Sequence, residues 1–174
     1  MLRSTRLDKM IRYMTLAVST AAGIADSAQV PFLGSSATLC QSILESVQKQ
    51  TVKSNKDECI QMVENIHETL CLIIDLYTTS QTNGVLPPAL LYDIGKFAET
   101  LQKVYTFIRG QQGMRKIKKI FKYSDNASQL EMCKTELQSV LERFKVRLML
   151  GCPWTLQQLK CRKMLSNNMK NSWL

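Results

Sequence analysis

Few residues of this chain are suited to catalysis or metal binding. It has one histidine, His67, and neither a second histidine nor clustered cysteines that could complete a metal site or a catalytic dyad. The carboxylates of Glu64, Glu68, Asp93 and Glu99 are spaced as on solvated outer faces of helices, so we assign them no catalytic role. The segment GQQGMRK lacks the Walker spacing and a preceding strand. The sequence therefore predicts a protein that is not an enzyme and binds no metal or cofactor.

Positive charge is the strongest chemical signal, with 23 Lys and Arg against 14 Asp and Glu and a net charge of +9. One basic cluster has apolar residues among its charges and no acid before Asp125: Arg115, Lys116, Lys118, Lys119 and Lys122. A second set lies near the N-terminus. Its members, Arg6, Lys9 and Arg12, are three residues apart and form a rough basic stripe on a helix, opposite Leu7, Met10 and Met14.

Such basic segments attract either anionic lipid or nucleic acid. The interleaved apolar side chains favour lipid, because they can enter the headgroup layer while the cations pair with phosphates. No helix-turn-helix, zinc finger or stacking platform accompanies the charge, so we expect no specific nucleic-acid binding. Both segments also have an ordinary interpretation, as a solvated connection and as the charged outer face of a bundle helix. The sequence thus makes these basic residues candidate contacts for anionic membrane phospholipids.

The elements that would position these residues are helices, because apolar residues recur at helical spacing nearly throughout. We predict an all-α protein: an up-and-down four-helix bundle over residues 31–150, an additional N-terminal amphipathic helix within residues 1–30, and a loosely attached basic tail over residues 151–174. The first helix is expected from Leu7 to Ala28. Ser35 or Ser36 is a candidate cap for the next helix.

Four apolar stripes define the predicted core. They comprise Leu39, Ile43, Leu44 and Val47; Cys59, Val63, Ile66, Leu70, Ile73 and Tyr77; Leu90, Ile94, Phe97, Leu101, Val104 and Ile108; and Leu130, Cys133, Leu137, Val140 or Leu141, Phe144 and Leu148. Asn55 is a candidate cap for the third helix and Asp125, Asn126 or Ser128 for the last, while Pro87 and Pro88 set the start of the fourth.

The spacing of the cysteines and the composition of the N-terminal segment indicate in which cellular compartment the protein is expected. No pair of the six cysteines has the two-residue gap of a zinc knuckle or redox motif, which favours reduced thiols in a cytoplasmic protein over disulfides. The apolar run from Tyr13 to Ala25 is diluted by hydroxyl residues and glycine, and it is a poor match to a signal peptide or a transmembrane helix.

Four segments carry a family resemblance: VPFLGSSATLCQSILESVQ, NKDECIQMVENIHETLCLII, GVLPPALLYDIGKFAETLQKVYTFI and KIKKIFKYSDNASQLEMCKTELQSVLERFKV. They resemble the N-terminal helical domains of fungal NACHT and kinase-like proteins. Those domains are similar to the four-helix bundle of the mixed-lineage kinase domain-like pseudokinase, the necroptosis executioner, and to HeLo-type cell-death domains. The resemblance covers residues 30–146, and LPPALLYDIGKFAETLQK is its most specific piece.

The resemblance implies a cell-death or signalling bundle that is held inactive, then oligomerises and permeabilises the bilayer. Basic residues would bind acidic phospholipids, and the two basic sets described above match that role. The protein would be cytoplasmic and become peripheral to the plasma membrane on activation. The alternative is a soluble adaptor or oligomerisation module that docks a protein partner. Within these 174 residues no nucleotide-binding or kinase module comes after the bundle.

Overall fold

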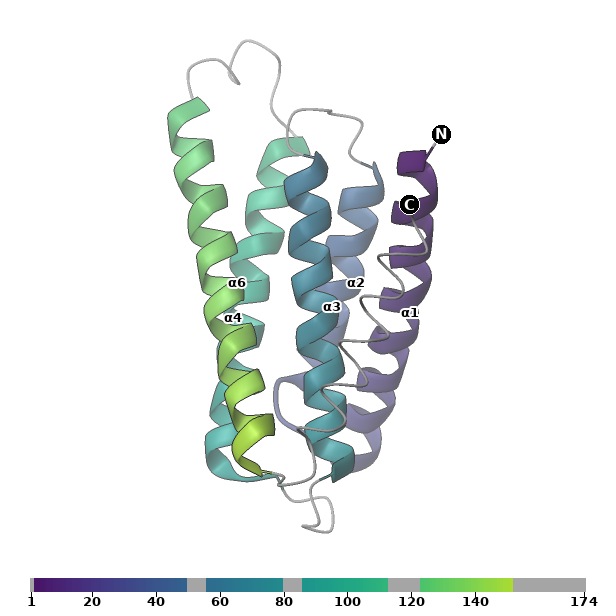
Figure 1. Ribbon diagram of the computed structural model, residues 1–174, viewed down its shortest axis with the longest axis vertical. Helices are drawn as coiled ribbons and strands as arrows, with labels where there is room; N and C mark the ends of the chain where they lie inside the picture. Colours follow the sequence, from purple (N-terminus) through teal and green to yellow (C-terminus); the bar gives the residue numbers. More distant parts are fainter. Residues whose placement is uncertain (1, 50–55, 80–85, 113–122, 152–174) are drawn as a thin grey trace.

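The computed structural model describes residues 2–49, 56–79, 86–112 and 123–151, and within these ranges it contains helices and no strand. The helices are α1 (Leu2–Ala28), α2 (Leu33–Lys49), α3 (Lys56–Thr79), α4 (Pro88–Gln112) and α6 (Tyr123–Gly151) (Figure 1). The predicted all-α class is confirmed.

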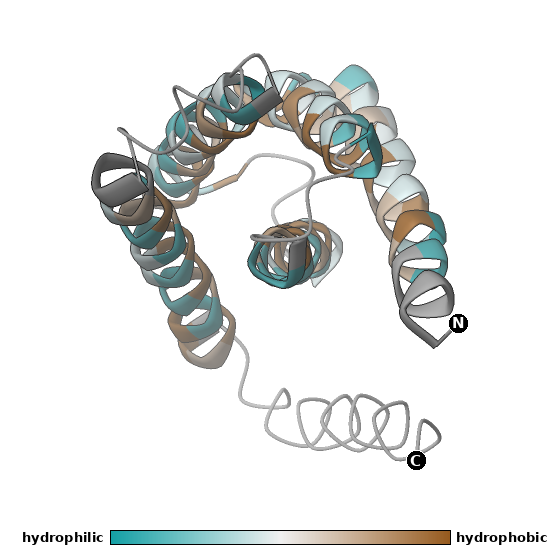
Figure 2. Ribbon diagram, turned by 90° about the horizontal axis from the view of Figure 1, so that it is seen from above, coloured by the Kyte–Doolittle hydropathy of each residue, from teal (hydrophilic) through white to brown (hydrophobic). Residues whose placement is uncertain are grey.

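The helices run alternately up and down along one long axis, so that α1, α3 and α6 share a direction (Figure 1). Seen from above, α1, α2, α4 and α6 form an arc, and α3 lies on its concave side (Figure 2). Each helix of the arc packs against the next one, and α3 packs against α1, α2 and α6. Helix α3 therefore joins the two ends of the arc.

The predicted apolar stripes form most of the core. Every stripe residue of α4 and α6 is buried, and so are those of α2 and α3 except Leu39 and Tyr77, which are half-buried at the edge. Phe97 of α4 and Phe144 of α6 are the largest fully buried side chains. Their rings meet edge to face, with centroids 6.5 Å apart and an interplanar angle of 80°, a favoured aromatic geometry.

Helix α1 contributes to the same core. Met14, Ala17 and Ala21 are buried at helical spacing. Ala25 of α1 lies near Gly34 of α2, where an added methyl group would be 3.6 Å from the Ala25 Cβ atom, an ordinary packing distance. The side of α1 that carries these residues is thereby fixed against the bundle, and the other side is left exposed.

The turn between α1 and α2 differs from the prediction. Helix α2 begins at Leu33, which is fully buried, so neither Ser35 nor Ser36 is its N-terminal cap. Both hydroxyls instead donate to the carbonyl oxygen of Phe32, at 2.9 and 2.7 Å. The turn is closed by two left-handed residues, Gln29 with φ of 50° and Phe32 with φ of 64°.

The predicted starts of the other helices agree with the structure for α4 but not for α6. Pro88 is the first residue of α4, as expected for a proline at this position. Helix α6 begins at Tyr123, which precedes the predicted caps Asp125, Asn126 and Ser128. Asn55, the predicted cap of α3, lies outside the described residues.

The prediction that Asp93 lies on a solvated helix face is wrong, because the residue is buried. Its carboxylate lies between α4 and α6, where the Nε atom of Arg147 donates to Oδ2 and the Nη1 atom of Arg143 lies 3.9 Å from Oδ1. Glu68 and Glu99 are exposed as expected, and they pair with Lys145 at 3.2 Å and Lys96 at 2.8 Å.

Candidate functional site: the exposed face of helix α1

The structure places two of the predicted lipid contacts on one exposed surface. Lys9 and Arg12 both lie on α1, and both side chains are exposed. Arg6 belongs to the same helix, but its side chain is outside the described part of the structure. The whole basic cluster Arg115, Lys116, Lys118, Lys119 and Lys122 lies outside the described residues, so its relation to α1 stays a prediction.

Two large apolar side chains share this surface with the cations. Tyr13 is 45% exposed and Leu16 is 67% exposed. Tyr13 follows Lys9 by four residues and Leu16 follows Arg12 by four, so all four lie along one side of α1, next to the buried stripe of Met14 and Ala17. Tyr13 lies at the edge of this side, where its ring also packs against His67 of α3. We call these four residues, Lys9, Arg12, Tyr13 and Leu16, the α1 face. Exposed cations beside exposed apolar groups are typical of helices that lie in a membrane interface.

Charge is distributed unevenly around the bundle. Helix α3 carries five acidic residues, Asp57, Glu58, Glu64, Glu68 and Asp75, against one lysine, Lys56. The α1 face, by contrast, contains two cations and no acid, so the two helices differ in the sign of the charge that they carry.

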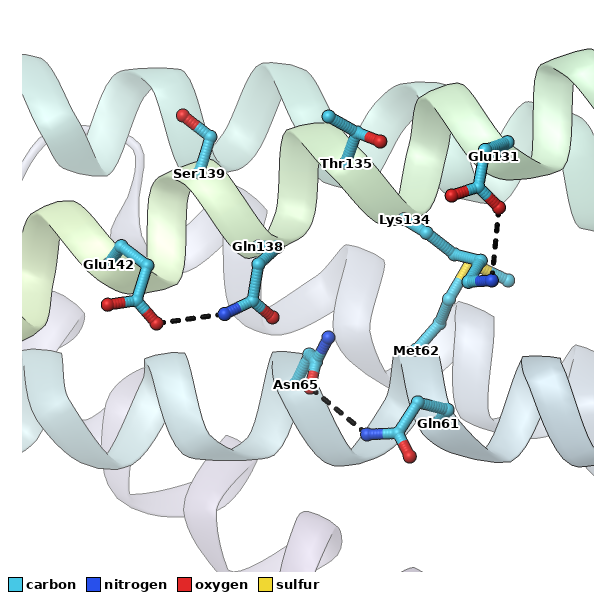
Figure 3. A pocket seen from close by; sticks show the side chains of 9 residues that line it. All are labelled: Gln61, Met62, Asn65, Glu131, Lys134, Thr135, Gln138, Ser139 and Glu142. Carbon is cyan, nitrogen blue, oxygen red and sulfur yellow. Dashed lines mark hydrogen bonds and ion pairs between the residues drawn. The ribbon is translucent and has the colours of Figure 1, made fainter.

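An open groove of about 590 Å³ runs between α3 and α6 (Figure 3). It is lined by Gln61, Met62, Asn65, Glu131, Lys134, Thr135, Gln138, Ser139 and Glu142. Its polar side chains pair within their own helices: the Gln61 amide donates to Asn65 at 3.3 Å, the Gln138 amide to Glu142 at 2.8 Å, and Lys134 to Glu131 at 3.1 Å (Figure 3). The hydrogen bonds drawn in the groove thus stay within single helices, and none of them joins α3 to α6.

One nucleophile does meet a base elsewhere on α3. The Sγ atom of Cys71 lies 3.6 Å from the Nε2 atom of His67, and the ring of Tyr13 packs against the imidazole with centroids 6.4 Å apart. Cys71 is half-buried, whereas Cys40, Cys59 and Cys133 are buried. None of these four cysteines forms a disulfide within the described residues, and Cys152 and Cys161 lie outside them.

Sequence reasoning found the cations of the α1 face but missed its apolar members. The signal was available, because Tyr13 and Leu16 follow Lys9 and Arg12 at helical spacing. It also missed the Cys71–His67 pair, although four residues separate the two on a predicted helix. In the described part of the chain, no three His, Cys, Asp or Glu residues are arranged to hold a metal ion.

None of the helices, within the residues described, is long and apolar enough to cross a membrane. No protein-family model, curated protein or solved structure matches the chain.

Proposed function

We propose that this protein is a non-catalytic helical module that binds anionic phospholipid membranes peripherally through the α1 face. The observation that carries the proposal is the exposure of Tyr13 and Leu16 beside Lys9 and Arg12 on one side of α1. Single exposed apolar side chains are common on protein surfaces, but here two of them lie beside two cations on one helix, which makes an amphipathic surface. At a bilayer, they enter the interfacial layer while the two cations meet lipid phosphates.

The expected binding free energies show how strongly the α1 face alone would bind a membrane. Each cation near an anionic leaflet contributes about 1 kcal/mol, so Lys9 and Arg12 together contribute about 2 kcal/mol. Complete burial of an exposed leucine adds about 1.5–3 kcal/mol, and Leu16 is already one-third covered in the free protein. The α1 face therefore gives weak, reversible binding. We propose that the basic cluster over residues 115–122 adds the further contacts that stable attachment needs.

The family resemblance extends this proposal to the events after binding. In that extension, a four-helix bundle of α2, α3, α4 and α6 carries α1 as its membrane-contacting helix, and bound copies form a homo-oligomer that permeabilises the plasma membrane. The chain would be cytoplasmic until then. The exposed α1 face and the predicted basic cluster support the lipid step of this sequence of events.

A soluble adaptor that docks a protein partner is the second candidate. It is favoured by an apolar patch near the end of α6, where Val146, Met149 and Leu150 are 50%, 54% and 83% exposed. Exposed apolar groups gathered in this way are typical of protein interaction surfaces. This function predicts binding that depends on the patch of α6 and not on lipid charge.

Vesicle co-sedimentation with two matched double variants tests the lipid function. Lys9→Gln/Arg12→Gln removes two charges from the α1 face, and Lys96→Gln/Lys134→Gln removes two from α4 and α6. All four cations are at least partly exposed. Lys96 and Lys134 form surface ion pairs, and Lys96 also lies 5.9 Å from the ring centroid of Tyr92. We expect the first variant to lose about thirtyfold in partitioning to phosphatidylserine vesicles, corresponding to about 2 kcal/mol, and the second to lose much less.

Equal losses in the two variants would mean that net charge alone, and not the α1 face, drives binding. No loss in either variant would favour the adaptor. Leakage of a trapped dye from the same vesicles separates simple attachment from permeabilisation. Circular dichroism of both variants controls for folding.

A further inference from the structure

We propose that Cys71 is a site of covalent modification by soft carbon electrophiles of the α,β-unsaturated carbonyl class, with His67 as the base that accepts the thiol proton. The inference is independent of lipid binding. It rests on three features of the structure: a thiol within hydrogen-bond reach of an imidazole, an aromatic ring beside that imidazole, and a difference in exposure among the cysteines.

The geometry is that of a nucleophile beside its base. Four residues along α3 bring the Nε2 atom of His67 to 3.6 Å from the Sγ atom of Cys71, within hydrogen-bond reach for sulfur. The Tyr13 ring, from α1, lies beside the imidazole, with ring centroids 6.4 Å apart and an interplanar angle of 50°. A thiol within hydrogen-bond reach of an imidazole is the pair of nucleophile and base found around activated nucleophiles.

Exposure distinguishes Cys71 from the other described thiols. Cys71 is half-buried, whereas Cys40, Cys59 and Cys133 are enclosed in the core, so Cys71 is the most accessible of the four described cysteines. Burial also raises the pKa values of all three core thiols, that of Cys59 to about 11, which keeps them protonated and unreactive near neutral pH. They serve as internal references for Cys71.

The proposed step is an addition without a leaving group or a change of oxidation state. The thiol proton passes to His67 Nε2, and the thiolate sulfur forms a bond to the β-carbon of the electrophile. The electrons of the C=C bond shift to the α-carbon, which takes a proton from the imidazolium or from water. One S–H bond and one C=C π bond are consumed, and one C–S and one C–H bond are formed.

The position of the thiol gives such an adduct a structural consequence. His67 meets Tyr13 across the seam between α1 and α3, and Cys71 lies one turn further along α3, where it is partly packed against the core. Because Cys71 follows His67 by four residues, its side chain lies on the same side of α3, and an adduct there would lie close to α1. Modification of this thiol would therefore disturb the seam that holds the exposed face of α1.

Site-resolved mass spectrometry after limited treatment with N-ethylmaleimide tests the proposal. The experiment uses the full chain with Cys152→Ser and Cys161→Ser, so that the four described thiols compete for the reagent. We expect Cys71 to be labelled at least about tenfold faster than Cys40, Cys59 or Cys133. In the same background, His67→Asn should slow labelling of Cys71 severalfold while the core thiols keep their rates.

Each alternative outcome counts against the proposal. Equal labelling of Cys71 and Cys40 would show that reaction occurs only through unfolding. An unchanged Cys71 rate in a folded His67→Asn variant would remove the histidine from the step. If that variant fails to fold, His67→Gln replaces it, and the ranking of the four thiols in the parent protein decides the site by itself.

Discussion

The carboxylate of Asp93 and the guanidinium of Arg147, 54 residues apart in the sequence, are joined by a hydrogen bond between α4 and α6. Only 4% of the Asp93 side chain is exposed, compared with 36% of Arg147. Arg143 lies near the other carboxylate oxygen and is 53% exposed. The buried charge is thus the carboxylate, and the arginines reach it from the solvent side.

This asymmetry predicts unequal effects of removing the two partners. Arg147→Met leaves a buried carboxylate with only the more distant Arg143, and should lower the free energy of unfolding by about 3–5 kcal/mol. Asp93→Asn leaves Arg147 within reach of water, and should lower it by about 1–2 kcal/mol. Urea denaturation of the two variants, with Arg143→Met as the exposed control, measures the difference. If Arg147→Met lowered the free energy of unfolding no more than Arg143→Met does, the Asp93–Arg147 pair would not be what stabilises the contact between α4 and α6.

The aromatic pair at the centre of the core gives a second prediction. Phe97 is fully buried against Phe144, so Phe97→Ala should lower the free energy of unfolding by about 3–5 kcal/mol through lost burial and a residual cavity. Tyr92, on the same helix, is 60% exposed, and Tyr92→Ala should cost less than about 1 kcal/mol. Chemical denaturation compares the two. Similar losses in both variants would show that Phe97 does not occupy the centre of the core.

The buried thiol of Cys59 predicts a pH dependence of stability. Burial, with a smaller contribution from the Glu58 carboxylate, raises its pKa from 9.0 to about 11. Above about pH 9 the unfolded chain loses this proton while the folded protein keeps it, so the unfolded state binds fewer protons and stability falls as the pH rises to about 11. The site should contribute no pH dependence between about pH 6 and pH 8.

Comparison with Cys59→Ala isolates this effect from the titration of lysines and tyrosines, which both proteins share. The difference in the free energy of unfolding between the parent protein and the variant should fall by about 2–3 kcal/mol between pH 8 and pH 11. Each unit by which the Cys59 pKa differs between the folded and unfolded states corresponds to about 1.4 kcal/mol. Thermal or urea unfolding at the two pH values measures it. A constant advantage would show that Cys59 ionises equally in the folded and unfolded states.

The sequence predicted the core well because heptad spacing directly records which side of each helix is buried. Ile94, Phe97 and Leu101 are all fully enclosed at predicted positions. Local spacing could not reveal that Asp93 is buried, because its partner lies on another helix far along the chain. The start of α2 was missed for a related reason: the burial of Leu33 in the shared core, and not a hydroxyl cap, decides where the helix begins.

The candidate site was predicted in part. Lys9 and Arg12 lie on an exposed helix face as expected, because charged residues avoid the core whatever the helix packs against. The exposure of Tyr13 and Leu16 depends on which side of α1 meets α2 and α3. Alanine, serine, threonine and glycine dilute the apolar pattern of α1, so the sequence defines its orientation poorly, and the burial of Met14, Ala17 and Ala21 in the structure fixes it.

Partitioning of the unmodified protein between water and vesicles tests anionic-lipid binding most directly. The experiment compares phosphatidylserine-containing vesicles, pure phosphatidylcholine vesicles and a short DNA duplex, each at low and high salt. We predict binding to the anionic vesicles that weakens as the Debye length falls from about 30 Å at 0.01 M to about 3 Å at 1 M salt, with little binding to neutral vesicles. Equal binding to both kinds of vesicle, or tighter binding to DNA than to anionic lipid, would contradict the proposed function.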